Sequence, residues 1–214
     1  MVVSATLTTE WLRELGGEIL NTPPLEWAGV LLGVVQVWLA KANKVLLYPF
    51  GIASIVITLY VLYDAGLYAE ILLNLYYLVM SIYGWLHWVR QKDAPPVKVG
   101  YSHKKEWRIT LLIVAVGFPV LYYALIHFTD STVPAWDAWV SATAWAGMWL
   151  LAKRKIENWV WLNISNACAI PLMIHKGIHL YAALTLFLFI VAIFGYIDWR
   201  RIIRRERVEE GAMV

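Results

Sequence analysis

The stretch WRITLLIVAVGFPVLYYALIHF, Trp107–Phe128, decides the fold class of this chain. It holds one Lys or Arg, Arg108, and no acidic residue, and about 20 mainly apolar residues are enough for a helix to cross a bilayer. The run is too long for a strand and has no alternation of period two, which excludes a membrane β-barrel. It therefore predicts a transmembrane helix.

Six further stretches have the same character, two of them only as short spans. They are Leu25–Ala40, Val45–Tyr63, Leu67–Trp88, Trp136–Ala152, Trp159–His175 and His179–Trp199. The 214 residues are 61% hydrophobic and 15% charged, whereas soluble domains have about 45–50% apolar and about 25% charged residues. The sequence thus predicts an all-α membrane protein of seven transmembrane helices.

The positive charges predict the orientation of these spans. With the N-terminus outside, sixteen of the 18 Lys and Arg residues fall on the inner side, and Arg13 and Lys176 fall outside. Such an asymmetry follows the positive-inside rule, so we expect the C-terminus in the cytoplasm. Residues 1–24 lack the pattern of a cleaved signal, and Leu7, Trp11, Leu12, Leu15 and Ile19 share one face of an expected short surface helix.

An offset of 111 residues aligns the sequences of the two halves of the chain. The matches include Glu26 with Asp137, Trp38 with Trp149, Lys44 with Lys155, Gly84 with Gly195 and Trp88 with Trp199. Two triplets joined by one extra span have the same direction, so the pattern predicts a 3+1+3 parallel repeat with a solute site between the halves. The expected units are 1–24 (amphipathic), 25–90 (first triplet), 91–135 (loop and linker helix), 136–201 (second triplet) and 202–214 (charged tail).

Polar and aromatic side chains at membrane depth are the candidate binding residues. They are Asn74 and Tyr77 in the third span, Trp145 and Trp149 in the fifth, and Asn163 and Asn166 in the sixth. Aromatic faces can stack on a flat heteroaromatic ring, attract it when it is cationic, and leave its polar edge to amides. The alternative is that the amides only bond neighbouring helices together.

Several kinds of chemistry have no support in the sequence. No carboxylate lies clearly in mid-span, which favours facilitated transport over ion coupling. His175 and His179 have metal-ligand spacing but no evident third ligand, and no catalytic triad or phosphate loop is present. We therefore expect no metal, no cofactor and no enzymatic activity, and we read the C-terminal arginines as a topology anchor rather than a nucleic-acid site. A membrane enzyme or scaffold is the alternative of another class.

Three stretches resemble the PnuC family of bacterial vitamin transporters. They are LYAEILLNLYYLVMSIYGWLHW (Leu67–Trp88), PAWDAWVS (Pro134–Ser141) and KIENWVWLNISN (Lys155–Asn166). The resemblance implies a bundle like that of SWEET sugar transporters in the bacterial inner membrane. It also implies facilitated diffusion of nicotinamide riboside, followed by trapping through a cytosolic kinase.

The resemblance also bears on individual site residues. Asn166 and Trp159 occupy positions of a family Asn and Trp, which adds Trp159 to the expected contacts. Asn74 stands where nicotinamide riboside carriers of the family usually have Gln, and the Asn-Tyr-Tyr pattern is similar to branches associated with thiamine. Nicotinamide riboside, thiamine and riboflavin therefore stay open as substrates, as does assembly into a homo-oligomer.

Overall fold

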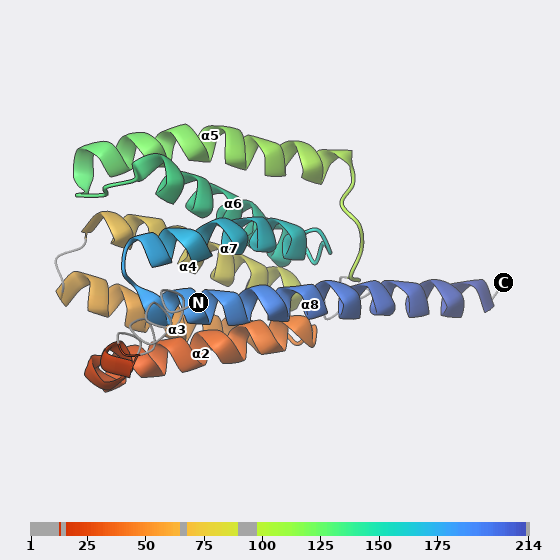
Figure 1. Cartoon of the computed structure of the whole chain (residues 1–214). Helices are drawn as coiled ribbons and strands as arrows, with labels where there is room; N and C mark the ends of the chain where they lie inside the picture. Colours follow the sequence, from red (N-terminus) through yellow and green to blue (C-terminus); the bar gives the residue numbers. More distant parts are fainter. Residues whose placement is uncertain (1–12, 14–15, 65–67, 90–97, 213–214) are drawn as a thin grey trace, which may run out of the picture.

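The structure, a computed structural model, describes residue 13 and residues 16–64, 68–89 and 98–212 (Figure 1). Its helices are α2 (Pro24–Lys41), α3 (Leu47–Asp64), α4 (Tyr68–Val89), α5 (Lys104–Phe128), α6 (Pro134–Ala152), α7 (Asn158–His175) and α8 (His179–Ala212). These helices coincide with the seven predicted stretches, which confirms the all-α class. Of the expected N-terminal surface helix, residues 16–21 are helical, and Leu7, Trp11, Leu12 and Leu15 lie outside the described residues.

Prolines and tight turns define the helix ends. Pro24 and Pro134 lie in the first turns of α2 and α6, where proline removes no hydrogen bond of the helix. After each of these helices the chain turns through one residue with positive φ, Asn43 at 55° and Arg154 at 54°. Lys44 N donates to Leu39 O and Lys155 N donates to Leu150 O, both at 2.9 Å. The two turns thus have the same geometry, 111 residues apart.

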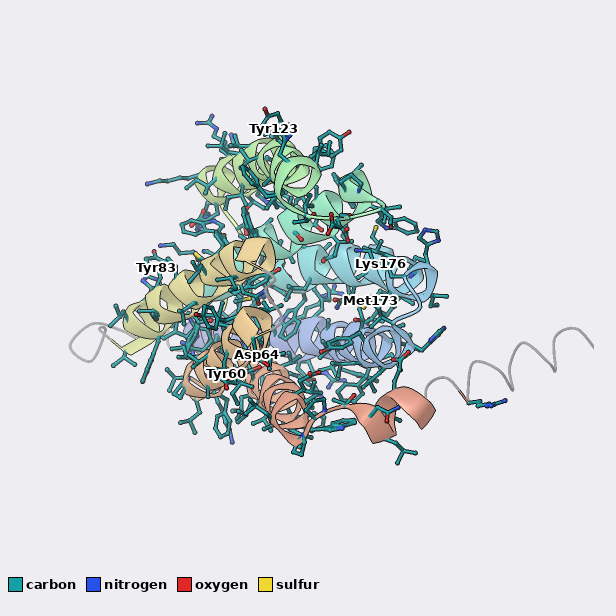
Figure 2. All side chains as sticks on the ribbon, turned by 90° about the vertical axis from the view of Figure 1, so that its left-hand side faces the viewer. Tyr60, Asp64, Tyr83, Tyr123, Met173 and Lys176 are labelled. Atoms are coloured by element: carbon teal, nitrogen blue, oxygen red, sulfur yellow. The ribbon has the colours of Figure 1, made fainter. Side chains whose placement is uncertain are left out.

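Six of the helices form a closed ring. α2 contacts α3, α3 contacts α4, α4 contacts α6, α6 contacts α7, α7 contacts α8, and α8 returns to α2. No two helices on opposite sides of this six-helix ring pack against each other within the described residues. α5 lies outside the ring against α6, as the end-on view in Figure 2 shows.

Corresponding positions of the two triplets make the same interhelical contacts. Ser54 Oγ donates to Gly29 O at 2.8 Å between α3 and α2, and Ser165 Oγ donates to Val140 O at 2.7 Å between α7 and α6. Each bond joins residues 25 apart. The two partners of the second bond each lie 111 residues after their counterparts in the first.

In a second pair of equivalent contacts, the large and the small residue have changed places between the two helices. Gly51 of α3 packs against the Gln36 side chain of α2, whereas Gly147 of α6 packs against the Leu162 side chain of α7. Position 36 corresponds to 147, and position 51 corresponds to 162. Because only one member of each pair is large, both helix pairs approach closely without overpacking.

Aromatic clamps close each triplet and join it to the other. Tyr48 packs on Gly84 and meets Trp88 edge-on, with ring centroids 5.2 Å apart. Trp159 packs on Gly195 and meets Trp199 edge-on, with centroids 5.6 Å apart. Trp88 Nε1 then donates to Ala152 O of α6 at 3.1 Å, and Trp199 Nε1 donates to Ala40 O of α2 at 3.0 Å. Each triplet therefore bonds the end of the other triplet's first helix.

The C-terminal helix includes most of the predicted charged tail. The predicted apolar span ends at Trp199, and α8 continues as one helix to Ala212 and projects beyond the bundle (Figure 1). Its last turns are rich in Arg and Glu, which are good helix formers although they end the apolar run. A hydropathy pattern therefore predicts where an apolar span ends but not where a helix ends.

Three helices are long and apolar enough to cross a membrane by length and composition within the described residues. They are Leu47–Asp64, Lys104–Phe128 and His179–Glu209. α7 is not among them, and it contains the polar residues Asn158, Asn163, Ser165 and Asn166. The count of seven spans therefore stays a prediction.

The glycine contacts in the clamps predict a stability effect. A Cβ added at Gly84 would lie 2.5 Å from the Tyr48 ring, and one at Gly195 would lie 2.7 Å from the Trp159 ring. Because these buried rings are rigid, Gly84→Ala and Gly195→Ala should each cost about 1–3 kcal/mol and lower the thermal unfolding midpoint of the detergent-purified protein. Gly16→Ala is the control, since its Cβ would meet nothing within 4 Å. Equal midpoints in all three variants would contradict the clamp.

Candidate functional site

A pocket of about 340 Å³ lies between α2, α3 and α8. Its polar lining groups are Glu26 and Gln36 of α2, Ser54 and Thr58 of α3, and Tyr181 of α8. The rest of the lining is Gly29, Val30, Gly33, Val34, Val37, Ile57, Val61, Leu62, Leu184 and Leu188. Its volume falls within the range of small-molecule sites, and its mostly apolar wall with a few polar groups is typical of them.

The polar groups of this pocket differ in their hydrogen-bond and ion-pair partners. The hydroxyl groups of Ser54 and Thr58 donate to backbone carbonyls, to Gly29 O at 2.8 Å and to Ser54 O at 3.1 Å. Glu26 has no ion-pair partner among the described residues and is the only charged residue in the lining. The pocket therefore presents one carboxylate beside the phenol ring of Tyr181, which favours an organic cation.

Two glycines beside the pocket allow α2 and α3 to pack closely. A Cβ added at Gly29 would lie 3.2 Å from Ile57 Cγ2, and one added at Gly33 would lie 3.3 Å from Ser54 Oγ. Both glycines are on the same face of α2, one turn apart. Because these positions have no side chain, the α3 side chains lie directly against the α2 backbone at this wall of the pocket.

A stack of aromatic rings joins α4 to α6. Tyr76 and Trp145 stack with ring centroids 4.4 Å apart and an interplanar angle of 23°, and Tyr76 Oη donates to Trp145 O at 3.1 Å. Tyr77 lies edge-on to Tyr76 at 6.2 Å. The indole Nε1 of Trp145 is buried and has no hydrogen-bond partner among the described residues. Trp145 also lines an apolar pocket of about 350 Å³ between α4, α5 and α6.

The second predicted tryptophan of α6 lies near the end of that helix. Trp149 stacks on Tyr83 with centroids 6.1 Å apart, and Lys153 Nζ lies 5.1 Å from the Trp149 ring. Lys41, Trp38 and Phe194 make a similar cation–π group between α2 and α8. The surroundings of Trp149 therefore resemble a structural contact between helices, and its Nε1 is buried without a partner in the described part of the chain.

Two of the three predicted α7 residues are half-buried amides. Around the helix, Asn166 lies between Leu162, which packs on Gly147 of α6, and Trp159, which packs on Gly195 of α8. Asn166 is therefore on the side of α7 that faces the inside of the six-helix ring. Asn163 lies one turn after Trp159, and its Oδ1 is buried without a hydrogen-bond partner among the described residues.

Trp159 and Asn74 have different surroundings. Trp159 is 1% exposed in the main core cluster, where its ring fills the space beside Gly195. Asn74 is half-buried on the same face of α4 as Tyr77 and Ser81. Ser81 is 0% exposed, and its hydroxyl group has no partner within the described residues. Within the described residues, buried polar atoms without partners thus occur on α4, α6 and α7, the helices that carry the seven predicted contacts, and also on α3 at Tyr48 Oη.

Sequence reasoning missed part of the pocket between α2, α3 and α8. Glu26 and Gln36 were recognisable as polar groups of the first span, but Ser54, Thr58 and Tyr181 gave no signal of their own. The four-residue spacing of Gly29 and Gly33 was the available signal, because small residues at this spacing mark a close helix contact. The described residues contain no group of three His, Cys, Asp or Glu side chains that would hold a metal ion.

Comparison with known proteins connects this architecture to a family. Residues 23–201 match the family described as nicotinamide mononucleotide transporter. The curated proteins called nicotinamide riboside transporter PnuC from Escherichia coli (strain K12) and Shigella flexneri are each 21% identical, with 82% of this chain and 84% of theirs covered. The fold matches the crystal structure of the vitamin B3 transporter PnuC with a TM-score of 0.68 at 22% identity, covering 92% of both chains. The chain therefore belongs to the nicotinamide mononucleotide transporter family, as its resemblance to PnuC predicted.

Proposed function

We propose that this chain carries nicotinamide riboside across the membrane by facilitated diffusion. The observation that carries the proposal is the pocket between α2, α3 and α8, whose only charged lining group is Glu26. Nicotinamide riboside combines a cationic pyridinium ring with a carboxamide and a ribose, and a carboxylate near aromatic and amide groups suits all three parts. The name of the curated relatives supports the same substrate.

The distribution of cations favours the riboside over its phosphorylated form. α3, α4, α6 and α7 contain no Lys or Arg, α2 has only Lys41 in its last turn, and the arginines of α8 begin at Arg200. A phosphate monoester carries about −1.5 to −2 charges near neutral pH, and a buried anion needs cationic partners. The inside of the ring lacks such partners over these helices, so a mononucleotide is a poor substrate for this arrangement.

None of the seven predicted contacts lines the pocket of Glu26, so we propose them as contacts of the solute elsewhere on its path through the six-helix ring. The amides of Asn74, Asn163 and Asn166 hydrogen-bond the carboxamide and ribose, and the ring of Tyr77 packs against the pyridinium. Trp145 and Trp149, which stack on Tyr76 and Tyr83, border this path from α6. The buried Asn163 Oδ1 and Trp145 Nε1, which lack partners in the described residues, support binding there, since unpaired polar atoms inside a protein are costly. Trp159 packs so closely on Gly195 that its role is to position the neighbouring Asn163.

The proposed topology has seven spans in a 3+1+3 parallel repeat, with the N-terminus outside and the C-terminus in the cytoplasm. The matching hydrogen bonds of Ser54 and Ser165, the matching turns at Asn43 and Arg154, and the two aromatic clamps support the repeat. Rocking of the two triplets opens the inside of the ring to each side in turn. In the inner membrane of a bacterium, a cytosolic kinase traps the imported solute.

One observation favours a second substrate. Asn74 is shorter than the Gln expected for nicotinamide riboside carriers, and thiamine also has a cationic heteroaromatic ring. Thiamine is therefore the alternative within the same site. A membrane enzyme or scaffold would not carry a solute across the bilayer. Uptake into liposomes that contain only the purified protein therefore distinguishes a transporter from these two classes.

Reconstituted protein tests the transport proposal. Sealed liposomes that contain the protein should fill with labelled nicotinamide riboside faster than protein-free liposomes, and unlabelled nicotinamide riboside should compete at least about tenfold better than the mononucleotide. Glu26→Gln should weaken uptake about fivefold, because a half-exposed ion pair contributes up to about 1 kcal/mol.

The matched control for Glu26 is Asp130→Asn, which removes an exposed carboxylate in the loop between α5 and α6. Stronger competition by thiamine would assign the site to thiamine. Equal filling of liposomes with and without protein would reject a transporter, and equal effects of Glu26→Gln and Asp130→Asn would reject the pocket.

Two neighbouring positions on α7 should separate substrate binding from stability. Asn163→Leu removes a buried acceptor that has no partner among the residues that the structure describes, so it should leave the unfolding midpoint unchanged or higher while uptake falls at least about tenfold, which corresponds to about 1.4 kcal/mol. Ser165→Ala removes the 2.7 Å bond to Val140 O, so it should cost about 1 kcal/mol of stability and leave uptake per folded molecule unchanged. Normal uptake by Asn163→Leu would remove this residue from the site.

Cysteine labelling tests the orientation. In a Cys168→Ser background, Thr132→Cys in the loop before α6 should react with an impermeant maleimide on intact cells. Arg205→Cys near the end of α8 should react only after permeabilisation, because an odd number of proposed spans separates the two positions. Labelling of both cysteines from the same side would exclude three spans between them.

A further inference from the structure

We call the pocket between α2, α3 and α8, which contains Glu26, the carboxylate pocket. A second pocket, of about 540 Å³, lies toward the other end of α8. It is lined by Tyr101, Tyr196, Ile197, Arg200, Arg201, Ile203, Arg204 and Arg207. The lining contains four arginines and no acidic residue. Leu188, which lines the carboxylate pocket, lies about 12 Å along the helix axis from Tyr196, the nearest α8 residue in the lining of the second pocket, and the two linings share no residue.

Three of the arginines belong to one helix face. Arg200, Arg204 and Arg207 follow the i, i+4, i+7 spacing, so their side chains project from the same side of α8. None of the three has an ion-pair partner among the described residues, whereas Arg201 pairs with Asp198 at 3.1 Å. The face therefore presents three guanidinium groups whose charge the described part of the chain does not neutralise.

The wall opposite this helix face is held in place by hydrogen bonds. Gly100 N donates to Arg154 O at 3.1 Å, and Ile156 N donates to Gly100 O at 3.0 Å. Ser102 donates from its backbone and its hydroxyl group to the Glu157 carboxylate at 2.7–3.0 Å. Tyr101 lies between these two anchors, so its position in the pocket is fixed.

The tyrosine and the arginine face meet across the pocket. The Arg207 guanidinium lies 5.8 Å from the centroid of the Tyr101 ring. Val99, two residues earlier in the same segment, is 4% exposed in the main core cluster. The pocket is thus formed between exposed arginines of a helix and a segment that is anchored to the core.

We propose that this pocket binds the phosphate group of an anionic phospholipid or of a soluble phosphate ester. Guanidinium groups match phosphate oxygens in geometry and charge, and Ile197 and Ile203 supply an apolar floor for the rest of the ligand. Arginine clusters that directly follow a membrane helix are typical sites for anionic headgroups. The binding is independent of the proposed transport substrate, because the two pockets share no residue.

Titration of the detergent-purified full chain tests this proposal. Short-chain phosphatidylglycerol, below its micelle concentration, should raise the thermal unfolding midpoint in a saturable way, and short-chain phosphatidylcholine should not. The triple variant Arg200→Gln, Arg204→Gln, Arg207→Gln should bind phosphatidylglycerol at least about tenfold more weakly. The control Lys104→Gln, Lys105→Gln, Arg205→Gln removes the same charge from exposed residues outside the pocket and should change binding less than twofold.

A second series distinguishes the source of the phosphate. If glycerol 3-phosphate by itself raises the unfolding midpoint and competes with phosphatidylglycerol, the ligand is a soluble phosphate ester. If only phosphatidylglycerol acts, the ligand is the lipid headgroup. Equal weakening in both triple variants, or no saturable shift with either ligand, would overturn the proposal. The unfolding midpoints without ligand show that both variants are folded.

Discussion

The two indole N–H groups that bond across the triplets hold the rest of the structure in place. Trp88 donates to Ala152 O and Trp199 donates to Ala40 O, at the ends of α6 and α2. Both carbonyls lie in the last turn of a helix, and Ala40 O also accepts a hydrogen bond from Asn43 N at 2.9 Å. Each triplet thus completes the other, and six helices close into a ring at one end of the bundle. The stack of Tyr76 on Trp145 joins α4 to α6 at a second place along these helices.

The ring also explains how polar groups are distributed in a chain that is mostly apolar. The chain belongs to a family of multi-pass membrane transporters, and a lipid-facing amide has no water to bond. Ser54 and Ser165 satisfy their hydroxyl groups on neighbouring helix carbonyls. Asn163 Oδ1 and Trp145 Nε1 are buried without partners among the described residues. Sites that break the rule of paired buried groups are commonly functional.

Much of the fold followed from the sequence, because apolar length and the 111-residue offset are both properties of a linear pattern. The offset paired Gly84 with Gly195 and Trp88 with Trp199, and both pairs lie in equivalent clamps. The first triplet has a large residue at position 36 and glycine at 51, whereas the second has glycine at 147 and a large residue at 162. This compensation in size was not predictable, because the sequence does not show that the two positions are in contact.

The pocket-lining residues were harder to predict than the fold, and the charged residues show why. A hydropathy pattern marks Glu26 as a helix end and Arg200, Arg204 and Arg207 as a topology anchor, but both groups line pockets. The carboxylate pocket includes Tyr181 near the start of α8, and the arginine pocket lies near its end. One helix therefore lines a pocket with a carboxylate near its start and a pocket with four arginines near its end, and an apolar segment separates the two.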